Sequence, residues 1–270
     1  MALQRERILI LAKTYPSPSA SYIETSCVAG INANGEMRRL FPVPFRFLED
    51  DQQFSKWQWI DVKVEKARGD HRPESFRIDI GTLACGEKVS THAEWQPRRE
   101  WIRRIPQFEA FSDLEKWSGT TKGSLALLKP RELTGLSIVA ARKAEWSEEE
   151  ILKLTHAQGQ GSLLTEPEAR SEIAMLKKLP CDFYYEYSCA DGSSIRHKIV
   201  DWEAGQLYRR CRRDYGSDCD EVFRQKLLGS MQSKDMMLLM GNQHRFQNQW
   251  LIISLIYPPR QTPTMQGALF

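Results

Sequence analysis

Two carboxylates and a histidine in the last third of the chain are spaced in a way that could support hydrolysis. Asp201 and Glu203 flank Trp202 directly after an apolar run, and His197 precedes Asp201 by four residues. If a β-strand continued through Glu203, all three groups would share one of its faces. They could then activate water or hold a metal for cleavage of a phosphodiester, a glycosidic bond or a modified base. Glu24 is a further catalytic candidate. The alternative is structural: Asp201 caps a helix and Glu203 interacts with its dipole.

Cationic and aromatic side chains that could bind a polyanion occur in separate parts of the chain. Arginine forks bind phosphate, and flat rings stack on bases. Residues 95–104 alone hold four arginines and two tryptophans. The alternative for this segment is a surface helix whose tryptophans pack inward while its arginines are solvated. The candidate nucleic-acid-binding residues are Lys13, Tyr15, Arg38, Arg39, Arg46, Arg98, Trp101, Arg103, Arg209 and Arg213.

A β-hairpin over residues 22–46 is expected to position the first of these cations. Asn34 and Gly35 lie between two apolar runs, which is the pattern of a two-residue type I′ turn. The return strand carries Arg38 and Arg39 next to each other. Because side chains alternate along a strand, only one of the two can face the core. We expect the other to lie in water or on an anion.

Short apolar runs separated by turn signals predict several strands and favour a small barrel over a sandwich or a helical bundle. A short helix is expected from about Pro97 to Pro106. Further along, the pattern predicts two strands of a second barrel. The predicted strands lie at 6–12, 57–66 and 76–80, and those of the second barrel at 124–128 and 135–141.

The polar, glycine-bearing stretch at 156–167 is the best candidate for a linker. After it, an Asp191-Gly192 turn predicts a second hairpin, and two helices and two apolar strands complete a self-consistent unit. The predicted organisation is therefore one region at 1–155, a linker at 156–170, a C-terminal domain at 171–260 and a tail at 261–270.

Composition sets limits on the class of protein. The chain has 270 residues, of which 41% are hydrophobic and 27% charged, so a folded protein with a sizeable core is expected. A net charge of +3 argues against binding by bulk charge but allows a local basic patch. The six cysteines form no C-x-x-C pair, and no signal peptide or membrane-length apolar run is found. We therefore expect a cytoplasmic protein that does not bind a membrane. No motif calls for a cofactor or a metal.

Several segments occur in an order that resembles a known family. They are the Cys-Val-Ala-Gly run from Cys27, the Arg-Arg-Leu-Phe-Pro return strand from Arg38, the Trp-x-x-Ile-Asp-Val strand from Trp57, and His-Arg-Pro-Glu-Ser at 71–75. Together they resemble the dual-OB domain family of prokaryotic conflict systems, most clearly over residues 6–80. The resemblance implies two OB-like barrels and nucleic-acid binding in phage defence or in DNA restriction and modification. Members of the family typically have Arg directly before Pro in the return strand, whereas this chain has Arg-Arg-Leu-Phe-Pro. Which of the two arginines corresponds to the arginine of the family therefore stays open.

The sequence thus predicts a mainly β protein with added helices (α+β), in which two OB-like barrels precede a smaller C-terminal α+β domain. The expected function is nucleic-acid binding, with DNA favoured, as a component of a bacterial antiviral defence or DNA-modification and restriction system. Its expected partners are DNA or RNA and other proteins of a defence operon. One alternative is a DNA-directed hydrolase that uses Asp201 and Glu203 for base excision, modified-base hydrolysis or phosphodiester cleavage. A protein-docking role is the third possibility.

Overall fold

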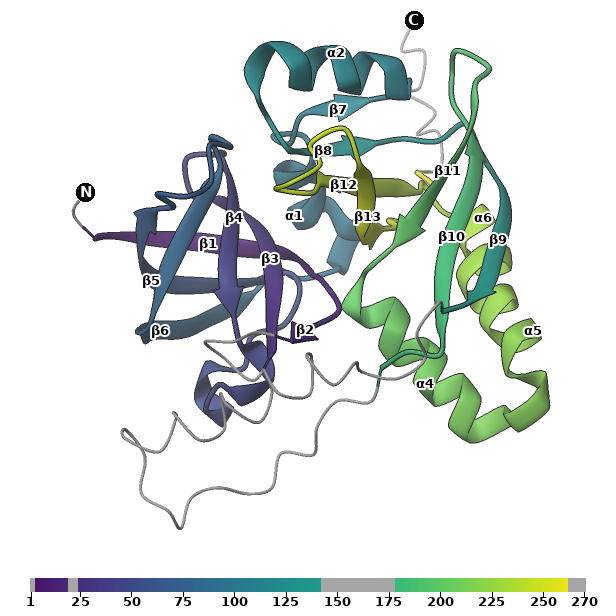
Figure 1. The fold of residues 1–270 in the computed structure, drawn as a ribbon, viewed down its shortest axis with the longest axis horizontal. Coiled ribbons are helices and arrows are strands. Elements are labelled where there is room, and N and C mark those ends of the chain that lie inside the picture. Colours follow the sequence, from purple (N-terminus) through teal and green to yellow (C-terminus); the bar gives the residue numbers. More distant parts are fainter. Residues whose placement is uncertain (1–2, 19–23, 142–177, 262–270) are drawn as a thin grey trace, which may run out of the picture.

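A computed structural model describes residues 3–18, 24–141 and 178–261 of the chain. The protein is mainly β with added helices, as the sequence predicted. Its strands form two sheets, one of six strands and one of seven, that lie side by side (Figure 1). Within the described ranges, no helix has the length and apolar character needed to cross a lipid bilayer.

The first sheet closes into a barrel of five strands. Around the barrel the order is β1-β5-β6-β4-β3, and β3 pairs back onto β1. All of these pairings are antiparallel except that of β4 with β6, and the short β2 adds to the edge of β3. The strands are β1 (Gln4–Lys13), β2 (Ser17–Pro18), β3 (Glu24–Asn32), β4 (Met37–Val43), β5 (Gln58–Lys66) and β6 (Ser75–Lys88).

Strand β1 is buried on both of its faces, which explains its nearly continuous apolar sequence. Ile8 and Ile10 belong to the core inside the barrel, together with Val28 and other residues. Leu9 and Leu11 point outward into a second core, which they share with residues of the seven-stranded sheet. The apolar run from Ile8 to Leu11 therefore joins the barrel to the rest of the protein, because each face of the strand has its own core to fill.

The predicted hairpin is present, with Ile31 opposite Met37. Its turn differs from the expected type I′ turn, since only Gly35 has a positive φ, of 87°. Asn32 closes a longer connection instead: its side-chain oxygen accepts from the backbone N–H groups of Asn34 and Glu36 at 3.1 and 2.9 Å. An Asn side chain that bonds the backbone two residues on is a common alternative turn.

Both arginines of the return strand are buried. We expected one of them to lie in water or on an anion: neither lies in water, but Arg38 does pair with carboxylates. Arg38 lies at the barrel end, where it pairs with Glu6 at 2.7 Å and Glu36 at 2.6 Å. Arg39 points to the opposite side and donates to the carbonyl and hydroxyl of Ser124 at 2.9 and 3.0 Å. The alternation was predicted correctly, but the second sheet covers the outer face, and no strand pattern could show that.

The second sheet has the open order β7-β8-β12-β13-β11-β10-β9. No pairing within the described residues closes it, so a second OB-like barrel is not confirmed. The predicted Asp191-Gly192 hairpin joins β10 to β11, and Gly192 has a φ of 81°. The strands are β7 (Gln107–Phe108), β8 (Leu125–Leu128), β9 (Glu132–Ala140), β10 (Cys181–Ser188), β11 (Ser194–Ile199), β12 (Met237–Asn242) and β13 (Trp250–Ile256).

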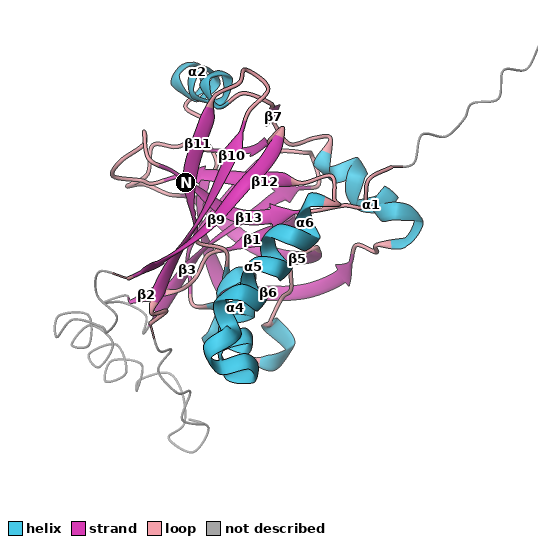
Figure 2. Ribbon diagram, turned by 90° about the vertical axis from the view of Figure 1, so that its right-hand side faces the viewer, coloured by secondary structure: helices cyan, strands magenta, loops and turns pink. Residues whose placement is uncertain are grey.

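Helices α4 to α6 lie along one side of the second sheet (Figure 2). Tyr208, Phe223 and Leu227 of this helical run share a core with Phe183 and Tyr185 of β10. On the other side, β8, β12 and β13 pack against the barrel. The helices are α1 (His92–Ile102), α2 (Phe111–Thr121), α4 (Trp202–Tyr215), α5 (Cys219–Arg224) and α6 (Ser230–Gln232), with a π turn at Gln225–Gly229 and barrel turns η1 (Phe45–Phe47) and η2 (Asp50–Gln52).

The division between the two sheets falls between β6 and β7, earlier than the boundary that the sequence predicted. The two strands expected to belong to a second barrel, β8 and β9, are strands of the C-terminal sheet, and β9 pairs with β10 from Ala140 to Glu132. The predicted linker at 156–170 and all of the predicted tail except Gln261 lie outside the described residues. Composition can indicate a linker, but it cannot show that the strands on either side of it pair with each other.

Candidate functional site

A cleft of about 410 Å³ opens where the end of β1 meets the start of α4. The chain positions it through the backbone: Thr14 bridges to Asp201, and the N–H of Tyr15 donates to the carbonyl of Val200 at 2.7 Å. We call it the basic-aromatic cleft. It is lined by Lys13, Phe45, Arg46, Gln53, Phe54, Ser55 and Trp202.

Lys13 is the central cation of the cleft. Its Nζ atom donates to the carbonyl of Phe54 at 3.1 Å and lies 4.9 Å from the ring centre of Phe45. Among the described residues, no carboxylate is within ion-pair distance of this nitrogen. Burial lowers the pKa of the Lys13 ammonium below its ordinary value, and the Glu203 carboxylate partly offsets this. An anion bound in the cleft would favour the charged form.

Three aromatic rings meet at the first turn of α4. Trp202 contacts the ring of Phe45 edge-on at 4.9 Å between centroids and that of Tyr15 at 5.4 Å. The hydroxyl of Tyr15 accepts from Nε and Nη2 of Arg209 at 2.9 and 2.6 Å. The close approach of the Tyr15 ring explains why residue 205 is a glycine, since an added Cβ would lie 2.6 Å from Cδ2 of Tyr15. Sequence-distant rings and cations are thereby brought into one place.

Two further cations do not line the cleft but interact with Glu203, the residue after Trp202. Lys56 pairs with Glu203 at 3.8 Å, and its ammonium lies 5.9 Å from the ring centre of Tyr257. Arg98 stacks over Trp57 and Trp95 at 5.0 and 4.7 Å. Glu203 is the exposed carboxylate beside these charges, whereas Asp201 is buried.

Asp201 is a helix cap, in agreement with the structural alternative. Strand β11 ends at Ile199, so the extended arrangement that would align Asp201 with Glu203 does not form. One oxygen of Asp201 accepts from the N–H groups of Glu203 and Ala204 at 2.6 and 3.4 Å, and the other accepts from the N–H of Leu255 at 3.1 Å. Burial raises the pKa of the Asp201 carboxyl. Both of its oxygens are used by the backbone, which leaves neither free to activate water.

His197 lies in the core rather than beside Asp201. Its Nδ1 atom hydrogen-bonds to the hydroxyl of Tyr187 at 2.7 Å, and its ring packs against Phe111 at 4.7 Å. Burial lowers the pKa of His197 to about 4. Glu24 is part of β3, and its side chain is outside what the structure describes. In the described part of the chain, no three His, Cys, Asp or Glu side chains gather as metal ligands.

Of the predicted nucleic-acid-binding residues, Lys13 and Arg46 line the cleft. Tyr15 and Arg209 lie next to it, because Tyr15 contacts both Trp202 and Arg209. The others lie elsewhere. Trp101 packs edge-on against Trp59, and Arg103 is exposed near the end of α1. Arg213 is exposed at the far end of α4, where it pairs with Asp214 at 2.7 Å. Arg38 and Arg39 are buried in the contacts described above.

Sequence reasoning missed Phe45 and Phe54 and assigned Trp202 no role in binding. Phe45 directly precedes Arg46, so an aromatic beside a predicted cation was a usable signal. Phe54 carries no such signal, because its place in the cleft depends on how the segment with the η1 and η2 turns folds back toward α4.

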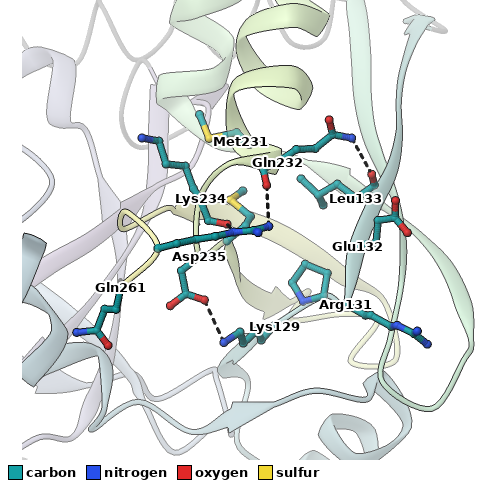
Figure 3. A pocket seen from close by; sticks show the side chains of 12 residues that line it. Lys129, Arg131, Glu132, Leu133, Met231, Gln232, Lys234, Asp235 and Gln261 are labelled. Carbon is teal, nitrogen blue, oxygen red and sulfur yellow. Dashed lines mark hydrogen bonds and ion pairs between the residues drawn. The ribbon is translucent and has the colours of Figure 1, made fainter. Parts of the chain in front are cut away.

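A larger cavity of about 780 Å³ lies near the C-terminal end of the described chain. Figure 3 shows Lys129 directed at Asp235. The two form an ion pair of 3.0 Å, and Arg260 donates to the carbonyl of Gln232 at 2.8 Å. Among the described residues, no aromatic side chain and none of the predicted site residues lines the cavity. The basic-aromatic cleft is therefore the stronger candidate.

Comparison with known proteins agrees with the division seen in the fold. A search of curated proteins finds no match to the chain. A family model described as "Domain of unknown function (DUF8758)" matches residues 4–104, which contain the barrel and α1. A second, described as "Domain of unknown function (DUF8757)", matches residues 107–270, which contain the whole second sheet and more than half of the chain. The chain therefore belongs to the family described as "Domain of unknown function (DUF8757)".

Proposed function

We propose that the protein binds nucleic acid, with DNA favoured, and that the basic-aromatic cleft is the contact site. The observation that carries this proposal is the convergence of Lys13, Arg46 and Arg209 with the rings of Trp202 and Phe45. Single-stranded nucleic acids are bound by cations that follow the backbone and by rings on which bases stack.

The barrel supports the same proposal. Its chain path runs β1-β3-β4, then places β6 parallel to β4 and β5 beside β1, which is the Greek-key order of an OB barrel. OB barrels bind oligonucleotides on the face of their second and third strands and on adjoining loops. Here those strands are β3 and β4, and the second sheet covers much of their outer face through Ala29, Ile31 and Arg39. We infer that the ligand binds instead beside the loop that follows β1, which borders the cleft.

The cellular setting is part of the proposal. The resemblance to the dual-OB family of prokaryotic conflict systems suggests a role in phage defence or in DNA modification and restriction, with partners from the same operon. Nothing in the geometry favours the alternative of a hydrolase at Asp201 and Glu203, since the backbone holds both oxygens of Asp201.

The test is fluorescence anisotropy with labelled single-stranded and duplex DNA and RNA across a range of salt concentrations. Each phosphate contact contributes about 0.7 to the log–log salt slope on a single strand. The double variant Lys13→Gln, Arg46→Gln should therefore bind more weakly and lose about 1.4 from that slope. The double variant Arg103→Gln, Arg213→Gln removes two exposed arginines outside the cleft and is the matched control.

Two results would contradict the proposal. A wild-type protein that binds no oligonucleotide in low-salt buffer would end it. The cleft is not the contact site if wild type and the cleft variant have the same log–log salt slope. The same conclusion follows if the salt slope decreases in the control variant and not in the cleft variant. A gel assay of the same samples for cleaved or base-free product tests the hydrolase alternative.

A further inference from the structure

The loop between β12 and β13, residues 243–249, is built to present side chains to solvent. Every residue from 244 to 249 is exposed, and Phe246 is 55% exposed. The loop reads Gln-His-Arg-Phe-Gln-Asn-Gln and contains no acidic residue. An exposed phenyl ring forgoes the stabilisation that burial would give. A loop of this composition offers amides, a guanidinium and a ring, but apart from Phe246 it has no apolar side chain that could pack in a core.

This loop is held in shape despite its exposure. The N–H of Gln243 donates to the carbonyl of Gln249 at 3.1 Å, and the N–H of Gln249 donates to the carbonyl of Phe246 at 2.8 Å. The buried Asn242 donates from its side chain to the carbonyl of Gln247 at 3.1 Å. The position of Phe246 is therefore set by hydrogen bonds at both ends of the loop.

The barrel holds the same loop from the other side. Arg72, which is buried, donates to the backbone carbonyl of Asn242 at 2.8 Å and pairs with Asp70 at 2.6 Å. Nδ1 of His244 lies 3.3 Å from the Asp70 carboxylate. Arg68 and His71 are exposed on this barrel loop. We call residues 68–72 and 243–249 together the composite tip, because the two family modules build it jointly.

We propose that the composite tip contacts nucleobases, with Phe246 stacking on a base and Arg245, Gln247 and Asn248 binding base edges. Gln and Asn can bond adenine with a donor and an acceptor, and Arg can bond guanine with two donors. Asp70, the acid of the tip, is neutralised by Arg72. Arg72 is a positioning residue that fixes the loop. This inference rests on the proposed function and adds base recognition to it.

The tip and the cleft have no residue in common, so they can be tested separately. The cleft is lined by residues of the end of β1, of the segment from η1 to Ser55 and of α4, whereas the tip consists of residues 68–72 and 243–249. Substitutions of exposed side chains of the tip therefore leave the lining of the cleft unchanged.

The experiment measures binding of Phe246→Ala to homopolymeric and mixed single-stranded oligonucleotides of equal length. We expect affinity to fall about tenfold, which corresponds to about 1.4 kcal/mol, with an unchanged salt slope because no phosphate contact is lost. Phe41→Ala is the matched control, since Phe41 is 51% exposed on β4. Gln247→Ala with Asn248→Ala should reduce the difference in affinity between adenine-rich and other sequences.

The outcomes separate this inference from the proposed function. If Phe246→Ala binds within about twofold of wild type while the cleft variant loses affinity, base recognition by the tip is refuted and the cleft proposal stands. An equal loss in Phe41→Ala would also refute it, because the barrel face would then supply the stacking ring. If wild type binds nothing, both proposals fail. Unfolding midpoints equal to that of wild type check that the exposed substitutions leave the fold intact.

Discussion

The buried His197 should make the stability of the protein depend on pH in a narrow window. Its pKa is lowered from 6.5 to about 4 by burial, and the ring is held neutral against Phe111. Between these two values the unfolded chain binds a proton that the native protein does not. The free energy of unfolding should therefore rise with pH from about 4 to about 6.5. The contribution of His197 is complete above that window and is lost as the pH falls through it.

The size of the effect follows from the difference between the two pKa values. A difference of about 2.5, at about 1.4 kcal/mol for each pKa unit, corresponds to about 3 kcal/mol. Protonation puts a hydrogen on both ring nitrogens, so Nδ1 can then only donate to the hydroxyl of Tyr187. That hydroxyl must then be oriented to accept, in a core with little room for rearrangement.

The measurement compares urea unfolding of wild type and His197→Asn at several pH values between 4 and 7. Carboxyl groups titrate in both proteins, so the difference between the two curves isolates the imidazole. Asn keeps a hydrogen-bond acceptor near Tyr187 but cannot take up a proton, and its smaller side chain lowers stability equally at every pH. We expect the gap between wild type and variant to narrow by about 3 kcal/mol as the pH falls.

A control substitution separates burial from hydrogen bonding as the cause. Tyr187→Phe leaves the imidazole buried, so its pH dependence should persist while overall stability falls by about 1 kcal/mol. A constant gap between wild type and His197→Asn from pH 7 to 4 would refute the reasoning. It would mean that the imidazole is solvated or that the native state accommodates its charge.

Three further substitutions test how the site is held. Arg39→Met should lower the free energy of unfolding by about 2–3 kcal/mol, because the carbonyl and hydroxyl of Ser124 lose their partner between the sheets; urea titration measures this, and a loss below about 0.5 kcal/mol would contradict it. Asp201→Ala should lower the free energy of unfolding by about 2 kcal/mol, because three backbone N–H groups lose their partner. Asp201→Asn keeps one acceptor and should lower it less. Thermal unfolding measures both variants, and equal losses of stability in the two would show that the cap is unimportant. Gly205→Ala should displace the ring of Tyr15 and destabilise the protein by about 1–3 kcal/mol. It should also weaken oligonucleotide binding in the anisotropy assay. If both the stability and the affinity of the variant equal those of wild type, the contact between residue 205 and Tyr15 is loose.

Much of the local structure could be predicted from the sequence, because it depends on neighbouring residues. The Asp191-Gly192 turn and the apolar runs on either side of it specify the hairpin of β10 and β11. Asp201 before the helix that begins at Trp202 indicates a cap, and the structure has it. The hairpin around Gly35 was predicted, whereas its turn type was not, since the Asn32 side chain supplies bonds that no turn pattern includes.

The candidate site, in contrast, was decided by the tertiary structure. Alternation along β4 separates Arg38 from Arg39, but whether a face meets water, an acid or another sheet depends on which distant element covers it. Composition alone could not show that β9 pairs with β10 across residues 142–177, or that the barrel packs on β12 and β13.

Residue types and spacing therefore determined the strands, the turns, the helix cap and the supply of cations and rings. Only the packing of the barrel against the second sheet decided which of those groups meet. It buried Arg39 against Ser124, and it brought Lys13 and Arg46 of the barrel to Trp202 of α4. The physical reason is that local sequence sets the direction of a side chain, whereas its neighbours are set by contacts between segments far apart in the chain.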